Sequence, residues 1–386
     1  MNLEKICQEI LSPEQLREIR EYEGIGFRCL LLDRLIDGVY LGAMAFFLAG
    51  PLDGVLQSFG GIFLNAYFRA ALFLTVVLAG HVCVSFPLSF YSGYVVEKKY
   101  GLSPLSVRGW IRRYALRMLL SWGMHLVLFL SLFALIRGCG EMWVPVAAAV
   151  FFLFSVVLGI LVPVVILPLF YTIEKLDDPT LLERLQKGTE GTTLKLEGVY
   201  RMNLSEETSK ANAMLAGLGK TRRVLLGDTL LEHFTPEEIE AVFAHEVGHH
   251  VHRHMAQLMA LMLVVTPILF FVMDVLLKMW VGNGAYASLP VWSLAFLEFA
   301  MLGMGWVLEP LQNGISRKFE RQSDAYATSH IANGSVLGDA FVKLAIQNKA
   351  DPNPNRWEVF WLHSHPAIAE RIGRARQNAT APGLEV

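Results

Sequence analysis

Six long apolar runs constrain the fold of this chain more than any other feature of its sequence. A helix that crosses a lipid bilayer needs about 20 largely apolar residues. Runs of this kind occupy roughly residues 35–52, 70–93, 117–136, 143–172, 257–281 and 287–312. Charged residues make up only 18% of the chain, against about 25% in soluble globular proteins. One such run could be a buried helix of a large soluble protein, but six predict a protein with about six transmembrane helices.

Basic residues alternate along the connections between these runs. The segment before the first run, the second connection, residues 173–256 and the tail are rich in Lys and Arg. The other three connections carry about one basic residue each, namely Arg69, Arg137 and Lys278. Because Lys and Arg are enriched in cytoplasmic loops, the pattern predicts that both termini and residues 173–256 are cytoplasmic, at the inner or plasma membrane in a bacterium.

The apolar runs divide the chain into five segments. They are an N-terminal cytoplasmic segment (1–34), transmembrane helices 1–4 (35–172), a cytoplasmic segment (173–256), transmembrane helices 5–6 (257–312) and a cytoplasmic C-terminal part (313–386). The two larger cytoplasmic pieces are short for independent domains, so we expect them to pack together as one. Within the first, turn residues bound three predicted strands, at 198–204, 211–217 and 222–228.

A helix is predicted to begin near residue 236. Thr235 is a favourable N-cap, Pro236 suits the first helical position, and Glu238 completes a capping box. No helix breaker follows before Pro267. We therefore expect one continuous helix over this range.

This predicted helix carries the sequence His245-Glu246-Val247-Gly248-His249, an H-E-x-x-H motif. Positions i and i+4 share one helix face, so both imidazoles can bind one Zn²⁺ at about 2.0–2.1 Å. Glu246 is placed to act as general base towards the water that the metal activates. The motif predicts a zinc hydrolase with one Zn²⁺ per chain.

A third zinc ligand is predicted from the hairpin of the last two apolar runs. If the connection turns at residue 285, His249 lies 36 residues before the turn and Glu320 lies 35 residues after it. Two helical arms with the same rise per residue bring these side chains to nearly the same height, so Glu320 is the predicted third ligand. Asp324, one turn later, could accept a hydrogen bond from a ligand histidine and fix its tautomer.

The same helical geometry places the metal relative to the bilayer. His249 precedes the apolar run near Leu258 by nine residues, or about 14 Å, so the zinc should lie just outside the cytoplasmic membrane face. On a continuous helix, His250, His252 and His254 point away from the metal. We expect these three side chains at the membrane interface, without a role in metal binding.

Five longer stretches carry a resemblance to a known family. They are "PLSFYSGYVVEKKYGLS" (87–103), "ANAMLAGLGKTRRVLLGDTLL" (211–231), "HEVGH" (245–249), "FERQSDAYA" (319–327) and "SHPAIAERI" (364–372). In this order they resemble the integral-membrane zinc metalloproteases of the CAAX prenyl protease 1 type, with the bacterial membrane protease HtpX as a more distant relative. Because the stretches span most of the chain, the resemblance is far more specific than H-E-x-x-H alone.

The resemblance implies the zinc ligands predicted above, Glu246 as the catalytic base, and an intramembrane chamber formed by the helices. His365, in "SHP", matches a histidine near the scissile carbonyl that could donate to the developing oxyanion. Arg371, in "AERI", matches an arginine beside the same site. Asn212 matches an asparagine on the strand along which a peptide substrate lies.

The expected fold class is an α-helical polytopic membrane protein with a cytoplasmic α+β zincin-like (gluzincin) catalytic domain. The eukaryotic members have seven transmembrane helices, and the extra N-terminal one is missing from the six predicted here. This difference leaves the CAAX substrate open. The expected partners are the lipid bilayer and peptide or protein substrates that are membrane-associated, including lipidated ones.

Two other functions share parts of this pattern. A site-2-type intramembrane protease also has H-E-x-x-H, but within a membrane span, whereas the flanking "EEIEAV" and "HVHRH" are too polar for the middle of a bilayer. A zinc transporter would require ionisable residues near the middle of several spans, and His81 and His125 are isolated in the sequence.

Nucleic acids and nucleotides are not expected as partners. The net charge of −2 gives no electrostatic support for binding nucleic acid. The stretch "GLGKTRR" (217–223) resembles part of a phosphate-binding loop, but Met214 occupies the position of its first glycine.

Overall fold

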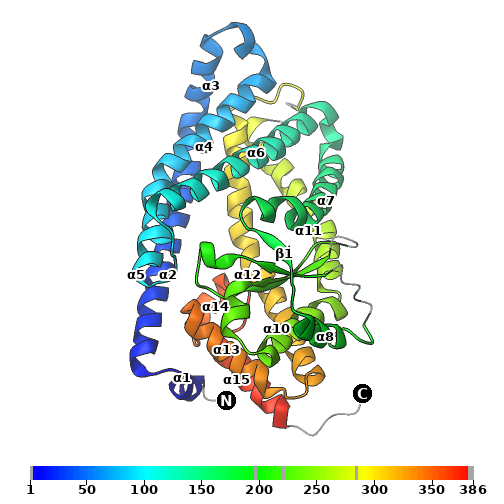
Figure 1. Cartoon of the computed structure of the whole chain (residues 1–386). Helices are drawn as coiled ribbons and strands as arrows, with labels where there is room; N and C mark the ends of the chain where they lie inside the picture. Colours follow the sequence, from blue (N-terminus) through cyan, green and yellow to red (C-terminus); the bar gives the residue numbers. More distant parts are fainter. Residues whose placement is uncertain (1–2, 193, 195–197, 219–221, 283–285, 381–386) are drawn as a thin grey trace.

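The computed structural model describes residues 3–192, 194, 198–218, 222–282 and 286–380. Long helices fill the upper part of Figure 1, and a small sheet with shorter helices forms its lower part. The first helices are α1 (Leu3–Ile10), α2 (Pro13–Ala43), α3 (Ala49–Ser58), α4 (Ala66–Phe90), α5 (Glu97–Lys99), α6 (Val107–Cys139) and α7 (Trp143–Leu161). They are followed by α8 (Pro179–Lys187), α9 (Asp228–His233), α10 (Pro236–Val251), α11 (His254–Val281), α12 (Ser293–His330), α13 (Ser335–Asn348), α14 (Arg356–Leu362) and α15 (Ile368–Thr380).

Five helical stretches of the described chain are long and apolar enough to cross a membrane. They are Pro13–Ser58, Ala66–Lys99, Val107–Leu169, His254–Val281 and Ser293–His330. The third stretch contains both α6 and α7, joined by a tight turn at Gly140–Met142. Each of the six predicted spans therefore overlaps one of these stretches for most of its length, and the chain is a multi-pass membrane protein.

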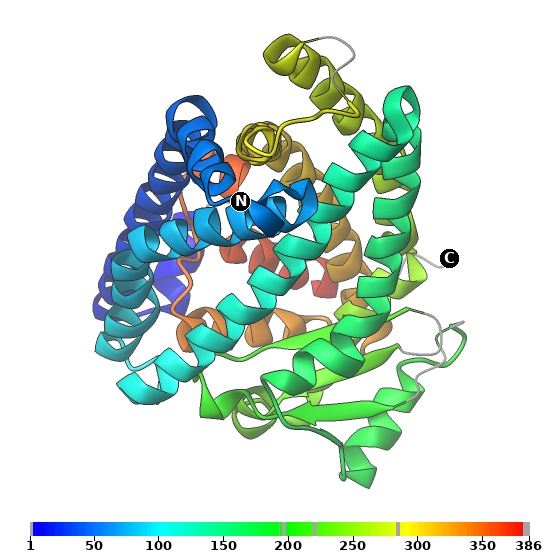
Figure 2. The same ribbon diagram turned by 90° about the horizontal axis from the view of Figure 1, so that it is seen from above.

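Pairwise contacts close the membrane helices into a ring. Helix α2 packs on α4, α4 on α6, α6 on α7 and α7 on α11, while α12 contacts both α11 and α2. Figure 2, a view from above, shows the helices of the first half curving round to the α11–α12 hairpin. The apolar core of this ring includes Phe73, Phe133, Trp143 and Leu294, all with side chains that are essentially fully buried.

A four-stranded sheet lies beside the ring, in the order β1-β2-β4-β3. Its strands are β1 (Ile173–Lys175), β2 (Val199–Met202), β3 (Ala213–Ala216) and β4 (Arg223–Gly227). Strands β2 and β4 are parallel, and the other two pairs are antiparallel. The three predicted strands are confirmed as β2, β3 and β4. Strand β1 was not predicted, because two of its three residues are charged and the single apolar residue, Ile173, gives no alternating pattern.

Strand β3 leaves one of its sides open. Its neighbour is β4, with Ala213 opposite Leu226 and Leu215 opposite Val224. The Gly227 amide donates to the Asn212 carbonyl at 2.9 Å. Because hydrogen-bonded pairs alternate along an antiparallel ladder, the backbone groups of Ala213 and Leu215 face away from β4, towards the open edge.

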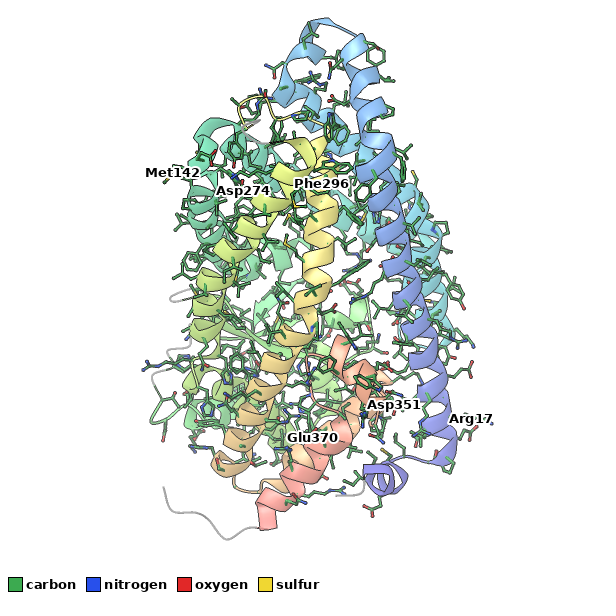
Figure 3. All side chains as sticks on the ribbon, turned by 180° about the vertical axis from the view of Figure 1, so that it is seen from behind. Arg17, Met142, Asp274, Phe296, Asp351 and Glu370 are labelled. Carbon is green, nitrogen blue, oxygen red and sulfur yellow. The ribbon has the colours of Figure 1, made fainter. Side chains whose placement is uncertain are left out.

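The soluble elements pack around the sheet and the lower part of α12. Helix α10 contacts α12 and α13, α13 contacts α15, and α15 contacts α12. Helix α1 also packs on α15, so the first and last described helices lie at the same end of the molecule. In Figure 3, Glu370 and Asp351 lie near this end, and Asp274 and Phe296 lie towards the opposite end.

The expectation of one continuous helix from residue 236 to Pro267 was wrong. Helix α10 ends at Val251, and α11 begins at His254. Between them Arg253 adopts a left-handed backbone conformation, with φ at +55°. A sequence signals a left-handed backbone mainly through Gly or Asn, and an arginine gives no such signal. The break is therefore not visible in the sequence.

Two sequence expectations fall partly outside the described residues. The turn assumed at residue 285 belongs to the segment 283–285, and residues 219–221 of the "GLGKTRR" stretch are likewise outside.

Candidate metal centre

The capping residues of α10 fix where its first turn begins. The Thr235 side chain accepts a hydrogen bond from the Glu238 amide at 3.3 Å, and the Glu238 carboxylate accepts one from the Thr235 amide at 2.7 Å. This is the predicted capping box. Lys343, on α13, lies 2.6 Å from the same carboxylate. The start of the motif helix is therefore held both locally and by a second helix.

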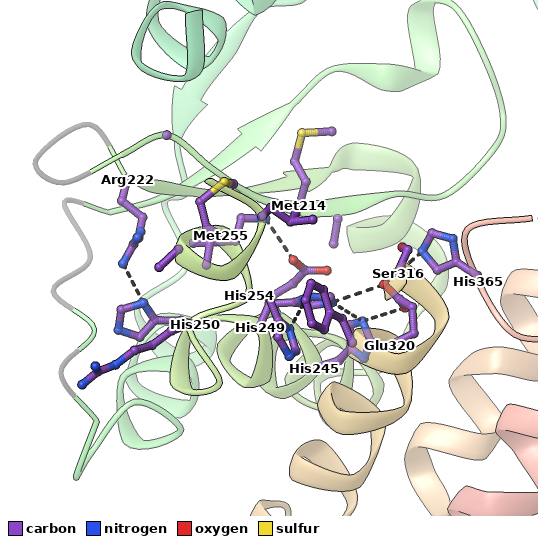
Figure 4. A pocket seen from close by; sticks show the side chains of 18 residues that line it. Met214, Arg222, His245, His249, His250, His254, Met255, Ser316, Glu320 and His365 are labelled. Atoms are coloured by element: carbon purple, nitrogen blue, oxygen red, sulfur yellow. Dashed lines mark hydrogen bonds and ion pairs between the residues drawn. The ribbon is translucent and has the colours of Figure 1, made fainter. Parts of the chain in front are cut away.

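His245 and His249 lie on one face of α10, and Glu320 approaches them from α12 (Figure 4). The two Nε2 atoms are 3.1 Å apart. The Glu320 carboxylate lies 3.3 Å from each of them. One potential ligand atom from each residue falls within 4.8 Å of the other two.

The close approach of α10 and α12 depends on a glycine inside the motif. A Cβ atom placed on Gly248 would lie 2.9 Å from the Ser323 Cα and 3.2 Å from its Cβ. Ser323 is fully buried and lies between Glu320 and Asp324 on α12. Without a side chain at Gly248, the backbones can pack closely enough for Glu320 to reach both histidines.

The donor set fits a zinc ion. Two imidazole nitrogens and a carboxylate are a known ligand set of zinc hydrolases, which leave a further position open. The Glu320 Oε2 atom is buried and lacks a hydrogen-bond partner of good geometry in the described structure. A buried carboxylate oxygen that has ion-pair neighbours but no well-formed hydrogen bond is well placed to bind a cation between the two imidazoles.

The outer side of His245 faces a buried ion pair. Its Nδ1 atom lies 2.9 Å from Asp324. Arg371, from α15, donates two hydrogen bonds to the same carboxylate, at 2.7 and 2.9 Å, and its Nη2 atom lies 3.3 Å from Glu320. Burial opposes protonation of His245, but Asp324 and Glu320 outweigh it and raise its pKa to about 9. Burial likewise opposes the charge of Arg371, yet the two carboxylates keep its pKa above the usual value.

Glu246 points towards the open strand edge. Its carboxylate accepts a hydrogen bond from the Leu215 amide at 3.0 Å. Both residues line a pocket of about 400 Å³, together with His245, His249 and Glu320. Asn212 directly precedes β3 and is exposed. The pocket thus joins the candidate ligands to the edge at which a peptide could add a strand.

His365 lies at the margin of this pocket, on the segment between α14 and α15 (Figure 4). Its Nε2 atom is 3.4 Å from Glu320, and its side chain is 59% exposed. The Ser364 hydroxyl is 2.9 Å from its Nδ1. The structure therefore brings every predicted site residue except Glu246 and Asn212 into contact with a predicted residue from another part of the chain. Glu246 lines the same pocket, and Asn212 lies at the start of the edge strand.

One residue at the centre was missed by the sequence analysis. His254, expected at the membrane interface, has only 2% of its surface exposed, and its Nδ1 lies 3.0 Å from the Nδ1 of His249. The error comes from the break at Arg253, because the helical-wheel argument assumed a continuous helix. A five-residue spacing between His249 and His254 was the available signal, and it is meaningful only if the chain turns between them.

Comparison with known proteins identifies the family. Residues 175–379, more than half of the chain, match the profile of "Peptidase family M48". The chain belongs to peptidase family M48. Residues 2–172 of this M48 peptidase match a second profile, "CAAX prenyl protease N-terminal, five membrane helices", where the described residues contain the long helices α2, α4, α6 and α7.

Relatives of this M48 peptidase occur in bacteria and eukaryotes. "Uncharacterized metalloprotease YhfN" of Bacillus subtilis is 28% identical over 309 residues, covering 78% of this chain and 71% of the relative. "CAAX prenyl protease 1" of Saccharomyces cerevisiae is 27% identical over 323 residues, covering 78% and 70%. The crystal structure of Ste24p from S. mikatae shares the fold, with a TM-score of 0.84 at 21% identity over 95% of this chain and 90% of that one.

These findings confirm the resemblance inferred from the sequence motifs. The chain is a membrane metallopeptidase, which favours an enzyme over a transporter. The individual roles assigned to its site residues remain predictions.

Proposed function

We propose that this M48 peptidase is a zinc-dependent endopeptidase that cleaves membrane or membrane-associated proteins, including lipidated ones, with Glu246 as general base. The observation that carries the proposal is the convergence of His245, His249 and Glu320 within 4.8 Å, with Glu246 lining the same pocket. One Zn²⁺ per chain would be held by these three side chains. When bound, the zinc would polarise the scissile carbonyl and make water a stronger nucleophile at neutral pH.

The residues of the chain supply the remaining steps. The open edge of β3 would pair with the substrate backbone through Ala213 and Leu215, with Asn212 at one end of the pairing. The Leu215 amide would then donate to a substrate carbonyl in place of the Glu246 carboxylate. Glu246 would take the proton from the attacking water and pass it to the leaving amine. His365, exposed at the margin of the pocket, would donate to the oxyanion. Arg371 would hold Asp324 against His245 and add positive charge near Glu320.

The position of the site supports a membrane-borne substrate. Glu320 lies on α12, the helix that continues upward as an apolar membrane span, and α11 begins five residues after His249. The alternation of basic residues supports a cytoplasmic location for the site and both termini, with residues 173–256 and 313–386 acting as one catalytic unit. The names of the eukaryotic relatives support prenylated proteins as one class to test.

The experiment that tests the proposal separates metal binding from chemistry. The purified wild type is reconstituted in liposomes with membrane-anchored peptides, both prenylated and unmodified, and cleavage is followed by mass spectrometry. We expect Glu246→Gln to keep one zinc per chain and to lose cleavage by about 10²- to 10⁴-fold, in keeping with loss of a general base. Glu237→Gln, an exposed position of the same helix, serves as the control and should cleave normally. Cleavage by Glu246→Gln at the wild-type rate would reject the assigned base.

A further inference from the structure

His254 joins the two helices that carry the candidate metal ligands. Its Nδ1 atom lies 3.0 Å from the Nδ1 of His249, on α10, and its Nε2 atom lies 3.0 Å from the Oε1 of Gln322, on α12. Its ring also stacks on Phe319 of α12, with centroids 4.1 Å apart and an interplanar angle of 12°. The ring is therefore fixed by three contacts, and Figure 4 shows it directly beside His249.

The chemistry of these groups determines where the protons lie. His249 directs its Nε2 atom at Glu320 and His245, so this nitrogen must be unprotonated to bind a metal, and the proton is on Nδ1. His249 then donates to His254, whose own proton is on Nε2. An amide oxygen accepts hydrogen bonds, so the Oε1 atom of Gln322 accepts the hydrogen bond that His254 donates from Nε2.

The opposite arrangement is incompatible with metal binding. If the amide nitrogen of Gln322 faced His254, it would donate to Nε2, and His254 would have to donate from Nδ1 to His249. His249 would then hold its proton on Nε2, where the metal must bind. Only the orientation with Gln322 Oε1 towards His254 leaves the ligand nitrogen free.

The two ligand histidines are thus supported by different partners. His245 faces the carboxylate of Asp324, which pairs with Arg371. His249 faces the neutral imidazole of His254, which in turn donates a hydrogen bond to the uncharged amide of Gln322. Both partners fix a ring orientation and a tautomer, but only the first places a negative charge behind its ligand.

We propose that His254 is a positioning residue of the metal centre: it holds His249 in the ligating tautomer and links it, through Gln322, to the helix that carries Glu320. The proposal rests on the proposed function in so far as the three converging residues bind a metal. Partners of this kind raise metal affinity because they remove rotational freedom from the ligand and make it more basic.

A matched pair of variants tests this role. His254→Phe keeps a ring that can stack on Phe319 but removes the acceptor, whereas His254→Asn places its Oδ1 atom where the imidazole Nδ1 was. Zinc affinity is measured by chelator competition, Co²⁺ binding by visible absorption, and the stability of the metal-free protein by thermal unfolding. We expect His254→Phe to lose zinc affinity by about 10- to 100-fold, with an altered Co²⁺ spectrum, and His254→Asn to recover most of it.

Further variants keep the test decisive. His252→Phe, whose ring stacks on His254 at 5.5 Å, should bind zinc like the wild type. If His254→Phe does not fold, Gln322→Leu leaves the ring in place but removes its acceptor, and affinity should fall in the same direction. The proposal would be overturned if His254→Phe bound zinc with wild-type affinity, or if Gln322→Leu did so where His254→Phe does not fold. An equal loss of affinity in His254→Asn and His254→Phe would also overturn it. Failure of the wild type to cleave any peptide while binding zinc would instead reject the proposed function.

Discussion

Gly248→Ala offers the most direct test of how the helix packing builds the metal centre. The added Cβ would lie 2.9 Å from the Ser323 Cα, where ordinary van der Waals contact begins at 3.4 Å. Helices α10 and α12 would have to separate by at least 0.5 Å at this point, the difference of those two distances. The backbone of Ser323 cannot rotate away as a flexible side chain would.

The size of this shift can be compared with what a zinc site tolerates. Ligand distances in metal sites hold to within about 0.2 Å. A displacement of 0.5 Å between α10 and α12 exceeds this tolerance, and α10 carries His245 and His249 whereas α12 carries Glu320. Overpacking costs about 1–3 kcal/mol, and the better helix propensity of Ala returns about 1 kcal/mol. We expect the free energy of unfolding to fall by up to about 2 kcal/mol and zinc affinity to fall about tenfold or more.

The assay is zinc competition with a chelator, followed by thermal unfolding of the metal-free and metal-loaded protein in detergent. Gly314→Ala, also on α12, is the matched control, because its nearest contact would be the flexible end of Arg317 at 3.8 Å. This control should be neutral or slightly more stable. If Gly248→Ala binds zinc and cleaves peptide within twofold of the wild type, the close approach of the helices does not set the ligand geometry.

Three further predictions concern charge, pH and capping. Arg371→Met removes the guanidinium from the buried Asp324 carboxylate and leaves His245 as its remaining partner. It should reduce the free energy of unfolding by up to about 3–5 kcal/mol, measured by chemical denaturation, with a smaller loss for Arg371→Lys. The raised pKa of His245, about 9, stabilises the metal-free protein below pH 6.5, and this contribution should disappear as pH rises through 9. Over the same range zinc affinity should increase by up to about tenfold per pH unit, because the metal displaces a proton; pH-independent affinity would contradict this. Thr235→Ala should reduce the free energy of unfolding by about 1 kcal/mol, measured by thermal unfolding, whereas Thr235→Ser keeps a favourable N-cap and should leave stability unchanged.

The sequence by itself determined the local features and the kind of chemistry. Apolar runs of membrane-spanning length, the capping box at Thr235 and the spacing of His245 and His249 depend on neighbouring residues, and all are found as predicted. The hairpin of the last two apolar runs also predicted that Glu320 lies level with the two histidines, and the three side chains do converge, although the first arm is broken between α10 and α11.

Only the tertiary structure decided which other side chains meet at the centre. The left-handed residue Arg253 lies in the turn between α10 and α11, and this turn places His254 behind His249 instead of at the predicted membrane interface. The partnership of Asp324 with Arg371 joins residues 47 positions apart on different helices. Such contacts depend on where separate elements pack and on one left-handed backbone angle at an arginine, a residue type that rarely adopts it. Neither leaves a periodic signal in the sequence.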